Sequence, residues 1–451
     1  MFNKVLVANR GEIALRVMRG CKALGIETVA IYSQADKGSL HVAFADQAIC
    51  VGEASNTDSY LNLANVLMAV EISGADAVHP GYGYFSERDH FAEALAQMGV
   101  KFIGPSAAAI VAMGDKAMAK AAAIASNCPV VRGSEGPVAT EQEALDLAAE
   151  IGYPVLLKAV AGGGGRGIRK VSDATELQKS WSIAQAEAQA SFGNDAMLVE
   201  KFVENPRHVE IQVLFDEHGN GVYLFERECS VQNLRHQKIV EEAPFALMEP
   251  ALRQAMGEAA VRVAGSVGYT NAGTVEFLVD EAGDFYFLEM NTRLQVEHPV
   301  TESVTAVDLV ELQLRIASGE PLPFTQDDLS LHGHAIEARI TAQDPDNDFA
   351  PSTGLVKVWN APGGLGIRMD THVYAGFTVS PFYDPMIAKL IVTGCDRDQC
   401  IRRLTVALDE FEVDGILTNI PFLRRLVRHP DFISGNVSTA FVPAMLEEAL
   451  V

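Results

Sequence analysis

The segments TVEFLV at residues 274–279 and FYFLEM at residues 285–290 decide how the middle of the chain folds. Both are apolar runs of strand-forming residues, and EAGD at 281–284 favours a turn, so the sequence predicts a β-hairpin. A turn centred between residues 282 and 283 places Glu276 directly opposite Glu289, on the same face. Like charges opposed across two strands are destabilising unless something neutralises them. We therefore expect Mg²⁺ or Mn²⁺ between both carboxylates and nucleotide phosphates; the alternative is a slipped register that turns one acid to solvent.

Polar side chains continue beyond this hairpin at every second position of residues 289–297. The five are Glu289, Asn291, Arg293, Gln295 and Glu297. If the chain stays extended, all five lie on one side of it. A solvated strand edge would show the same alternation, but the aromatic and apolar flanks disfavour that interpretation. With the basic residues near 207–208 and 235–238, the pattern indicates a cationic pocket suited to ATP and a small anion.

Four consecutive glycines occupy residues 162–165, between strand-like runs at 153–158 and 168–171. A dinucleotide-binding GxGxxG fingerprint needs a helix to begin at the glycines, whereas a strand begins here. A hairpin with a glycine tip instead predicts a mobile flap whose backbone N–H groups fold over phosphate oxygens. Lys158 before the flap and Lys116 strengthen this interpretation, and a merely floppy loop is the alternative.

Outside this middle region, the order of strand-like and helical runs indicates where the domains begin and end. Strand-like runs at 4–8, 28–32, 46–51 and 75–78 alternate with helical stretches, which predicts a parallel sheet covered by helices. An Ala-rich helical stretch is expected over 107–126, and the first domain boundary near residue 114. Residues 130–203 are interpreted as an insertion or lid, and an α+β stretch begins beyond about residue 330.

Composition narrows the class of protein. The 451 residues are 48% hydrophobic and carry a formal net charge of −24, which disfavours nucleic acid and anionic membranes as partners. Six scattered cysteines without a Cys-x-x-Cys motif indicate neither a zinc site nor a disulfide framework. Residues 1–12 become charged before a signal-peptide core forms, and no run of about 18 apolar residues occurs. We expect a cytoplasmic protein that does not span a membrane.

Several separated motifs together resemble the biotin carboxylase family, the ATP-grasp component of biotin-dependent carboxylases. Besides the flap, they are ANRGEIA at 8–14, HPGYG at 79–83, NPRHVE at 205–210, EMNTR at 289–293 and QVEHPVTE at 295–302. The resemblance extends from residue 1 to about residue 445. It implies a Rossmann-like N-terminal domain (1–114), an ATP-grasp domain (115–328) with a mobile lid at about 130–203, and a C-terminal α+β domain (329–451).

The resemblance implies a two-step reaction. Bicarbonate attacks the γ-phosphate of ATP to give carboxyphosphate, and CO₂ then passes to N1′ of biotin. The implied ATP contacts are Lys116, Lys158, Gly164, Gly165, Glu200, Lys201, Phe202, Val203, His208 and His236. Glu276, Glu289 and Asn291 would hold two Mg²⁺ or Mn²⁺ ions. Lys238, Arg293 and the backbone N–H of Val296 would bind bicarbonate, Glu297 would deprotonate it, and Arg339 would stabilise the biotin enolate.

The implied partners are a biotin carboxyl carrier protein, a carboxyltransferase component and a second copy of the chain. Biotin is usually attached within Met-Lys-Met, and none of the 13 methionines is followed by lysine, so we expect the carrier to be another polypeptide. Acetyl-CoA, carboxylated to malonyl-CoA for fatty acid biosynthesis, is the default acceptor; propionyl-CoA and pyruvate remain open.

The sequence departs from the family pattern at two places. One extra residue stands between Gln232 and His236, which leaves the geometry at Gln232 open, and Ala23 replaces an acid often found near the dimer interface. Two other functions compete: another ATP-grasp ligase, and a non-catalytic ATP-binding regulator. The bicarbonate residues disfavour the first, and the intact set of acids and arginines disfavours the second.

Overall fold

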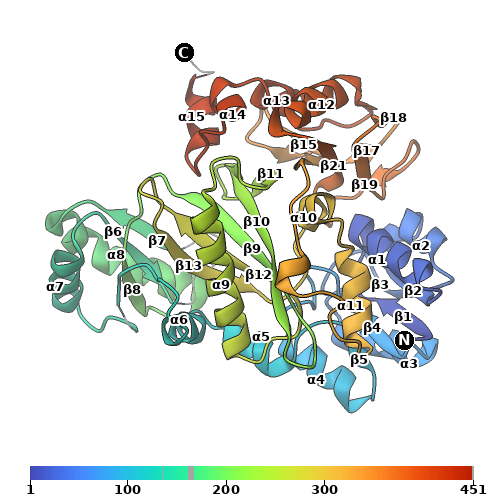
Figure 1. Cartoon of the computed structure of the whole chain (residues 1–451), viewed down its shortest axis with the longest axis horizontal. Coiled ribbons are helices and arrows are strands. Elements are labelled where there is room, and N and C mark those ends of the chain that lie inside the picture. The colour runs from blue at the N-terminus through green and yellow to red at the C-terminus, as the bar shows by residue number, and fades with distance from the viewer. Residues whose placement is uncertain (135, 161–166, 449–451) are drawn as a thin grey trace.

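The computed structural model describes residues 1–134, 136–160 and 167–448, and its elements are shown in Figure 1. Gly164 and Gly165 of the predicted flap lie outside these residues. The architecture is mixed α/β and α+β, as predicted, with a parallel sheet near the N-terminus and a large antiparallel sheet in the middle.

The N-terminal part is a five-stranded parallel sheet with the order β3-β2-β1-β4-β5. Its strands are β1 (Lys4–Val7), β2 (Glu27–Ser33), β3 (Gln47–Gly52), β4 (Ala77–His79) and β5 (Lys101–Phe102). Its helices are α1 (Gly11–Ala23), α2 (Leu40–Phe44), α3 (Leu63–Ser73) and α4 (Asp89–Gln97), with the 3-10 turn η1 (Gln34–Asp36). Ile13, Val17 and Cys21 of α1 are buried, so their four-residue spacing marks the packed face of this helix.

The helical stretch predicted over 107–126 is confirmed, and the structure divides it into two helices. They are α5 (Ala107–Gly114) and α6 (Lys116–Ala125). Asp115 between them has extended backbone, and its side chain caps α6 by accepting from the Met118 N–H at 2.9 Å. Lys116 therefore occupies the first position of α6.

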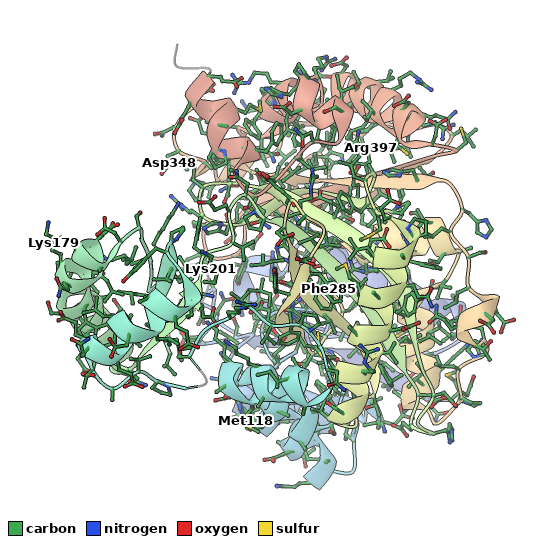
Figure 2. All side chains as sticks on the ribbon, turned by 60° about the vertical axis from the view of Figure 1, so that its left-hand side comes forward. Met118, Lys179, Lys201, Phe285, Asp348 and Arg397 are labelled. Atoms are coloured by element: carbon green, nitrogen blue, oxygen red, sulfur yellow. The ribbon has the colours of Figure 1, made fainter. Side chains whose placement is uncertain are left out.

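The predicted lid is a compact unit with its own small core. It contains α7 (Glu141–Ile151), β6 (Val155–Ala159), β7 (Ile168–Val171), α8 (Ala174–Phe192) and β8 (Met197–Lys201). The strands form an antiparallel sheet in the order β7-β6-β8, and Leu157, Trp181 and Val199 are buried beneath the helices. Figure 2 shows Lys179 on the outer side of this unit and Lys201 on the side that faces the rest of the molecule.

An eight-stranded antiparallel sheet, ordered β13-β12-β9-β10-β11-β14-β21-β19, forms the centre of the molecule. Its strands are β9 (Arg207–Phe215), β10 (Gly221–Gln232), β11 (Lys238–Ala243), β12 (Asn271–Val279), β13 (Phe285–Asn291), β14 (His334–Thr341), β19 (Ile367–Thr371) and β21 (Met386–Gly394). Helix α9 (Pro250–Ser266) lies across β9 and β10 (Figure 1). The sheet runs through the predicted boundary at 328–329, because β11 pairs directly with β14. The domain boundaries stay predictions.

The remaining elements include the rest of the C-terminal part, which lies at the top of Figure 1, and a helix, α11, that packs against α1 of the N-terminal part. They are α10 (His298–Thr305), α11 (Leu309–Ala317), η2 (Gln326–Asp328), β15 (Gln343–Asp344), β16 (Ala350–Pro351), β17 (Gly354–Leu355), β18 (Val358–Asn360), β20 (Thr378–Val379), α12 (Arg397–Glu410), β22 (Glu412–Asp414), α13 (Ile420–Leu426), α14 (Pro430–Ser434) and α15 (Phe441–Glu448). Leu404 and Leu408 of α12 pack with Leu390 of β21 in one buried cluster. Among the helices of residues 1–134, 136–160 and 167–448, none is long and apolar enough to cross a lipid bilayer.

Candidate active site

The predicted site residues meet in one cleft of about 1300 Å³ between the lid, the large sheet and the N- and C-terminal parts. Those that line it are Lys116, Lys158, Glu200, Lys201, Phe202, Val203, His208, His236, Lys238, Glu276, Glu289, Asn291, Arg293, Val296 and Arg339. Glu297 is fully buried just beneath the surface of the cleft. The structure therefore brings together residues that lie more than two hundred positions apart in the sequence.

The acid pair has the register that the hairpin pattern predicts. Glu276 on β12 pairs directly with Glu289 on β13. The predicted centre of the turn was wrong by half a residue, because the register shifts after Glu276 and Phe277 pairs with Phe287. This β-bulge leaves Leu288 as the additional residue on β13 and preserves the pairing of the acids.

Side chains of the protein neutralise Glu276, a task that the sequence argument assigned to a metal. His208 Nε2 lies 2.9 Å and Lys238 Nζ 3.2 Å from its carboxylate. Asn291 Nδ2 also donates to Glu276 Oε1 at 2.8 Å. Burial alone would raise the pKa of Glu276, but Lys238 and His208 lower it below its usual value. Glu276 is therefore ionised at neutral pH.

Glu289 differs from its neighbour, since it makes no ion pair within the described part of the chain. Burial and the adjacent Glu276 raise the pKa of Glu289. Together with the amide oxygen of Asn291, the two carboxylates offer hard oxygen donors of the kind that Mg²⁺ and Mn²⁺ prefer. The raised pKa of Glu289 indicates a carboxylate whose charge a cation would stabilise.

The five polar side chains of 289–297 were expected to share one side if the chain stays extended, and the chain does not stay extended beyond Asn291. Strand β13 ends there, the chain bends, and Glu297 becomes the N-cap residue of α10. The polar side chains nevertheless converge, because Arg293 Nη1 and Nη2 donate to Gln295 Oε1 and Asn291 Oδ1, each at 3.0 Å. Gln295 in turn donates to Glu276 Oε1 at 3.0 Å.

Glu297 is held between two cations. Lys238 Nζ donates to Oε1 at 2.6 Å, and Arg339 Nη2 donates to Oε2 at 3.0 Å. Burial would raise the pKa of Glu297, but Lys238, Arg339 and Arg227 lower it well below its usual range. Its carboxylate is therefore deprotonated at neutral pH and able to accept a proton.

A buried network beneath Lys238 was missed by the sequence analysis. Lys238 Nζ also lies 2.6 Å from Glu210 Oε2, and the fully buried Arg227 lies 2.5 Å from Glu210 Oε1. Arg227 Nη1 donates further to Thr301 on α10 at 2.9 Å. Glu210 belonged to the quoted NPRHVE motif, whereas Arg227 gave no signal because its partners come from three distant segments. The network fixes the position of Lys238.

The opposite end of the cleft is basic. Lys158 is ion-paired with Glu200, and Lys120 lies 3.0 Å from the same carboxylate. Burial would raise the pKa of Glu200, but these two lysines lower it. Lys120 was not predicted, although it lies one turn after Lys116 on α6. Lys201 directs its Nζ to the carbonyl oxygens of residues 152 and 153 at 3.0 Å, so this side chain anchors lid backbone.

The extra residue between Gln232 and His236 is accommodated in a turn. Asn233 Oδ1 accepts from the N–H groups of Arg235 and Gln237 at 2.9 and 3.0 Å, and His236 adopts left-handed backbone with φ +58°. Gln232 stays buried, pairs with Lys238 across β10 and β11, and lies 2.9 Å from His208 Nδ1. The departure from the family pattern therefore leaves Gln232 inside the site.

Comparison with known proteins agrees with this geometry. Residues 1–110 match the family model "Biotin carboxylase, N-terminal domain", residues 115–325 match "Carbamoyl-phosphate synthase L chain, ATP binding domain", and residues 337–444 match "Biotin carboxylase C-terminal domain". Biotin carboxylase from Nostoc sp. is 52% identical over 444 residues, covering 98% of this chain and 99% of the relative. The chain belongs to the biotin carboxylase family.

Solved biotin carboxylase structures share the whole fold. The biotin carboxylase–β-γ-ATP complex from Campylobacter jejuni is 45% identical, with a TM-score of 0.94 and coverage of 98% of this chain and 99% of that one. The biotin carboxylase domain dimer of 2-oxoglutarate carboxylase from Hydrogenobacter thermophilus, solved with MgADP, ADP and bicarbonate, is 47% identical, with a TM-score of 0.92 and coverage of 98% of each chain. As a biotin carboxylase, the chain is an ATP-dependent ligase that uses Mg²⁺ and bicarbonate to carboxylate biotin.

Proposed function

We propose that the cleft carries out both steps of biotin carboxylation, with Glu297 as the base at its centre. The observation that supports this most directly is the position of the Glu297 carboxylate between Lys238 and Arg339. Lys238 is also linked to Glu276, so the base lies one side chain away from the acid pair. The Glu297 carboxylate therefore contacts both Lys238, proposed for the first step, and Arg339, proposed for the second.

In the first step, bicarbonate binds to Lys238, Arg293 and the Val296 N–H, and Glu297 removes its proton. A bicarbonate that draws Lys238 away from Glu297 removes a cause of the lowered pKa, so the base becomes stronger when its substrate is present. Deprotonated bicarbonate then attacks the γ-phosphate and forms carboxyphosphate. The N–H and cation donors hold the planar anion in one orientation for this attack.

Lys116, Lys158 and the flap glycines Gly164 and Gly165 are proposed to bind the phosphates of ATP. Glu200, Lys201, Phe202, Val203, His208 and His236 would contact the rest of the nucleotide. Glu276, Glu289 and Asn291 would hold the divalent cations, which supply positive charge at the transferred phosphoryl group. Apart from the two glycines, which lie outside the described residues, these residues line the cleft, where the lysines attract an anionic nucleotide.

In the second step, carboxyphosphate is proposed to break down into CO₂ and phosphate, and this phosphate accepts the proton from N1′. Arg339 would stabilise the resulting enolate of biotin while N1′ takes up CO₂. Glu241 Oε1 accepts from Arg339 Nε at 2.6 Å, and Glu241 and Glu297 keep the pKa of Arg339 above its ordinary value despite burial. A guanidinium that stays charged suits the task, because negative charge develops on the ureido oxygen.

The carrier of biotin is proposed to be a separate biotin carboxyl carrier protein, and a carboxyltransferase component to take the CO₂ onward to acetyl-CoA. We further propose a homodimer in the cytoplasm. All six cysteines are unpaired, and the exposed thiols of Cys50 and Cys395 suit a reducing compartment. Identifying the biotinylated protein that co-purifies with the chain distinguishes acetyl-CoA from propionyl-CoA and pyruvate carboxylase assemblies.

One ratio tests the assignment of Glu297 and Arg339. Glu297→Gln should depress bicarbonate-dependent ATP cleavage and carboxybiotin formation together, by about a hundredfold or more, because carboxyphosphate must form before biotin can be carboxylated. Arg339→Ala should damage carboxybiotin formation more than ATP cleavage, since Lys238 and Arg293 can still hold bicarbonate. The measurement is phosphate released per carboxybiotin formed at saturating bicarbonate, with the exposed Arg428→Ala as the matched control. An Arg339→Ala variant with an unchanged ratio contradicts its role in the second step.

A further inference from the structure

Lys389 on β21 joins three parts of the molecule through one buried ammonium group. Its Nζ donates to the carbonyl oxygen of Val296 at 2.8 Å and lies 3.2 Å from Glu12 Oε1. Glu12 belongs to α1 beside the parallel sheet, and Val296 lies in the bend between β13 and α10. Lys389 itself has no exposed surface. Sequence motifs did not single it out, and no role in the reaction has been assigned to it above.

A lysine in this position is costly for the fold. Burial lowers the pKa of Lys389, but Glu12, Glu337 and Asp370 more than offset this effect, so the ammonium stays charged. Arg339 lies directly opposite on β14, and two cations opposed across strands repel each other. An apolar side chain of similar length would avoid both costs, but it would leave the buried Glu12 without its cation. The surrounding acids therefore explain the charge of Lys389, and they do not explain its hydrogen bond to the Val296 carbonyl.

The carbonyl that Lys389 holds belongs to the peptide between Val296 and Glu297. Its orientation sets the ψ angle of Val296, and with it the direction of the Val296 N–H relative to the Glu297 side chain. The preceding carbonyl, that of Gln295, is also fixed, because His298 Nδ1 lies 2.8 Å from it. Two buried side chains thus hold successive carbonyl groups of the bend, at the point where strand hydrogen bonding has ended.

We propose that Lys389 is a positioning residue for bicarbonate. It holds the peptide so that the Val296 N–H and the Glu297 carboxylate face the same anion, and it acts through the backbone without touching substrate. The inference rests on the proposed function, which assigns those two groups to bicarbonate. Because Glu12 lies on the other side of the ammonium, the same contact ties the N-terminal part to the bicarbonate site.

Two variants separate positioning from charge balance. Lys389→Met removes the donor and keeps the length of the side chain, but it leaves Glu12 buried without its cation and should lower Tm. The double variant Glu12→Gln with Lys389→Met removes that unpaired charge and should regain most of the lost Tm. Both should raise the KM for bicarbonate by about tenfold or more, because the carbonyl has lost its donor in each.

The measurements are the KM for bicarbonate in ATP cleavage, the Kd of MgATP by calorimetry, and Tm. The Kd of MgATP should change by less than about twofold, since the proposed ATP contacts are not altered. If the double variant regains the wild-type KM together with its Tm, Lys389 serves only as the partner of Glu12 and the inference is overturned. Wild-type ATP cleavage that ignores bicarbonate would overturn the proposed function and this inference with it. A responsive wild type with an unchanged KM in both variants overturns the inference alone.

Discussion

The buried carboxylate of Glu276 contacts charged and polar side chains from several strands of the site. It faces Glu289 across the hairpin, contacts His208 and Lys238, and accepts hydrogen bonds from two amide side chains. The contacts with His208, Lys238 and the two amides lower the cost of an ionised acid in the interior. Glu289 makes neither of these two ion pairs, so the protein compensates the charge of Glu276 more fully than that of Glu289. Glu289 is the one we expect to depend most on a bound cation.

Glu289→Gln tests this difference. We expect turnover to fall by about a hundredfold or more, because a ligand of the divalent cation is lost. Tm without nucleotide should stay unchanged or rise slightly, since a like-charge pair is relieved. Glu281→Gln, at the exposed tip of the same hairpin, is the control and should leave both quantities unchanged. A marked fall in Tm without metal would show instead that Glu289 has a structural role.

The sequence predicted residues whose signals are local and missed those whose contacts are distant. Glu276 and Glu289 could be paired because a short turn connects their strands. Lys389 could not be found in this way, since 93 positions separate it from Val296 and one buried lysine in an apolar strand leaves no periodic pattern. The same holds for Arg227, which lies 74 positions from Thr301. Resemblance to a family supplied the proposed roles of Arg339 and Glu297, which composition and spacing alone did not.

A second pair of opposed acids lies on the neighbouring strands β10 and β11. Glu228 on β10 lies opposite Glu242 on β11. Arg397 and His334 hold Glu242, and the pKa of Glu242 is lowered despite burial, whereas burial and Glu242 raise the pKa of Glu228 to about 7. One acid of the pair is therefore ionised while the other carries a proton over much of the physiological range.

This arrangement predicts a pH-dependent stability. The raised pKa means that folded Glu228 binds more proton than the unfolded chain between its ordinary value of 4.5 and about 7. Its contribution to the free energy of unfolding is therefore present at low pH and lost as pH rises through that window. Glu228→Gln removes this loss, so between about pH 5 and about pH 8 the variant should gain up to about 3 kcal/mol relative to wild type. Urea unfolding at several pH values measures the difference, and a difference independent of pH would contradict the prediction.

Helix α9 offers a test of packing against the large sheet. A Cβ at Gly257 would lie 2.6 Å from ring atoms of Tyr223 on β10, so Gly257→Ala should destabilise the fold by about 1–3 kcal/mol. Gly265 on the same helix is the matched control, because its Cβ would meet only Phe215 at 3.7 Å. Gly265→Ala should stabilise by up to about 1 kcal/mol. Equal effects of both substitutions on the free energy of unfolding would show that contact with Tyr223 does not decide the outcome.

Most elements could be predicted from the sequence, and the exceptions share a cause. The break between α5 and α6 depends on one side chain, Asp115, which caps the second helix inside an otherwise helical run. The bulge at Leu288 and the bend after Asn291 are likewise changes in the path of the chain that begin at a single residue. Periodicity averages over several residues, so it cannot locate such a change.

At the scale of the whole molecule, the cleft lies between parts that are far apart in the sequence. The N-terminal part supplies Glu12, the lid supplies Lys158, and the C-terminal strands supply Arg339. Because the cleft needs all of these parts, we expect the full chain to be the active unit. On the proposed function, biotin reaches Arg339 from outside, attached to a separate carrier.

An avidin blot tests whether that carrier is separate. The chain, purified after co-expression with a biotin ligase and a biotin carrier protein, should give no avidin signal at its own mass of 48.5 kDa. The carrier, at its own mass, is the positive control in the same lane. A covalent signal at the mass of this chain would contradict the prediction.

The continuous sheet that carries Lys238 on β11 and Arg339 on β14 fixes the distance between these two strands. Adjacent strands of a sheet stand about 4.8 Å apart, and a ladder of hydrogen bonds resists stretching in that direction. Lys238 and Arg339, which flank Glu297, therefore project from neighbouring strands of one sheet. The lid and the N-terminal part also line the cleft, but their strands belong to separate sheets. Mutations that loosen those two parts would change how often the cleft is fully assembled, but would leave the spacing of β11 and β14 unchanged.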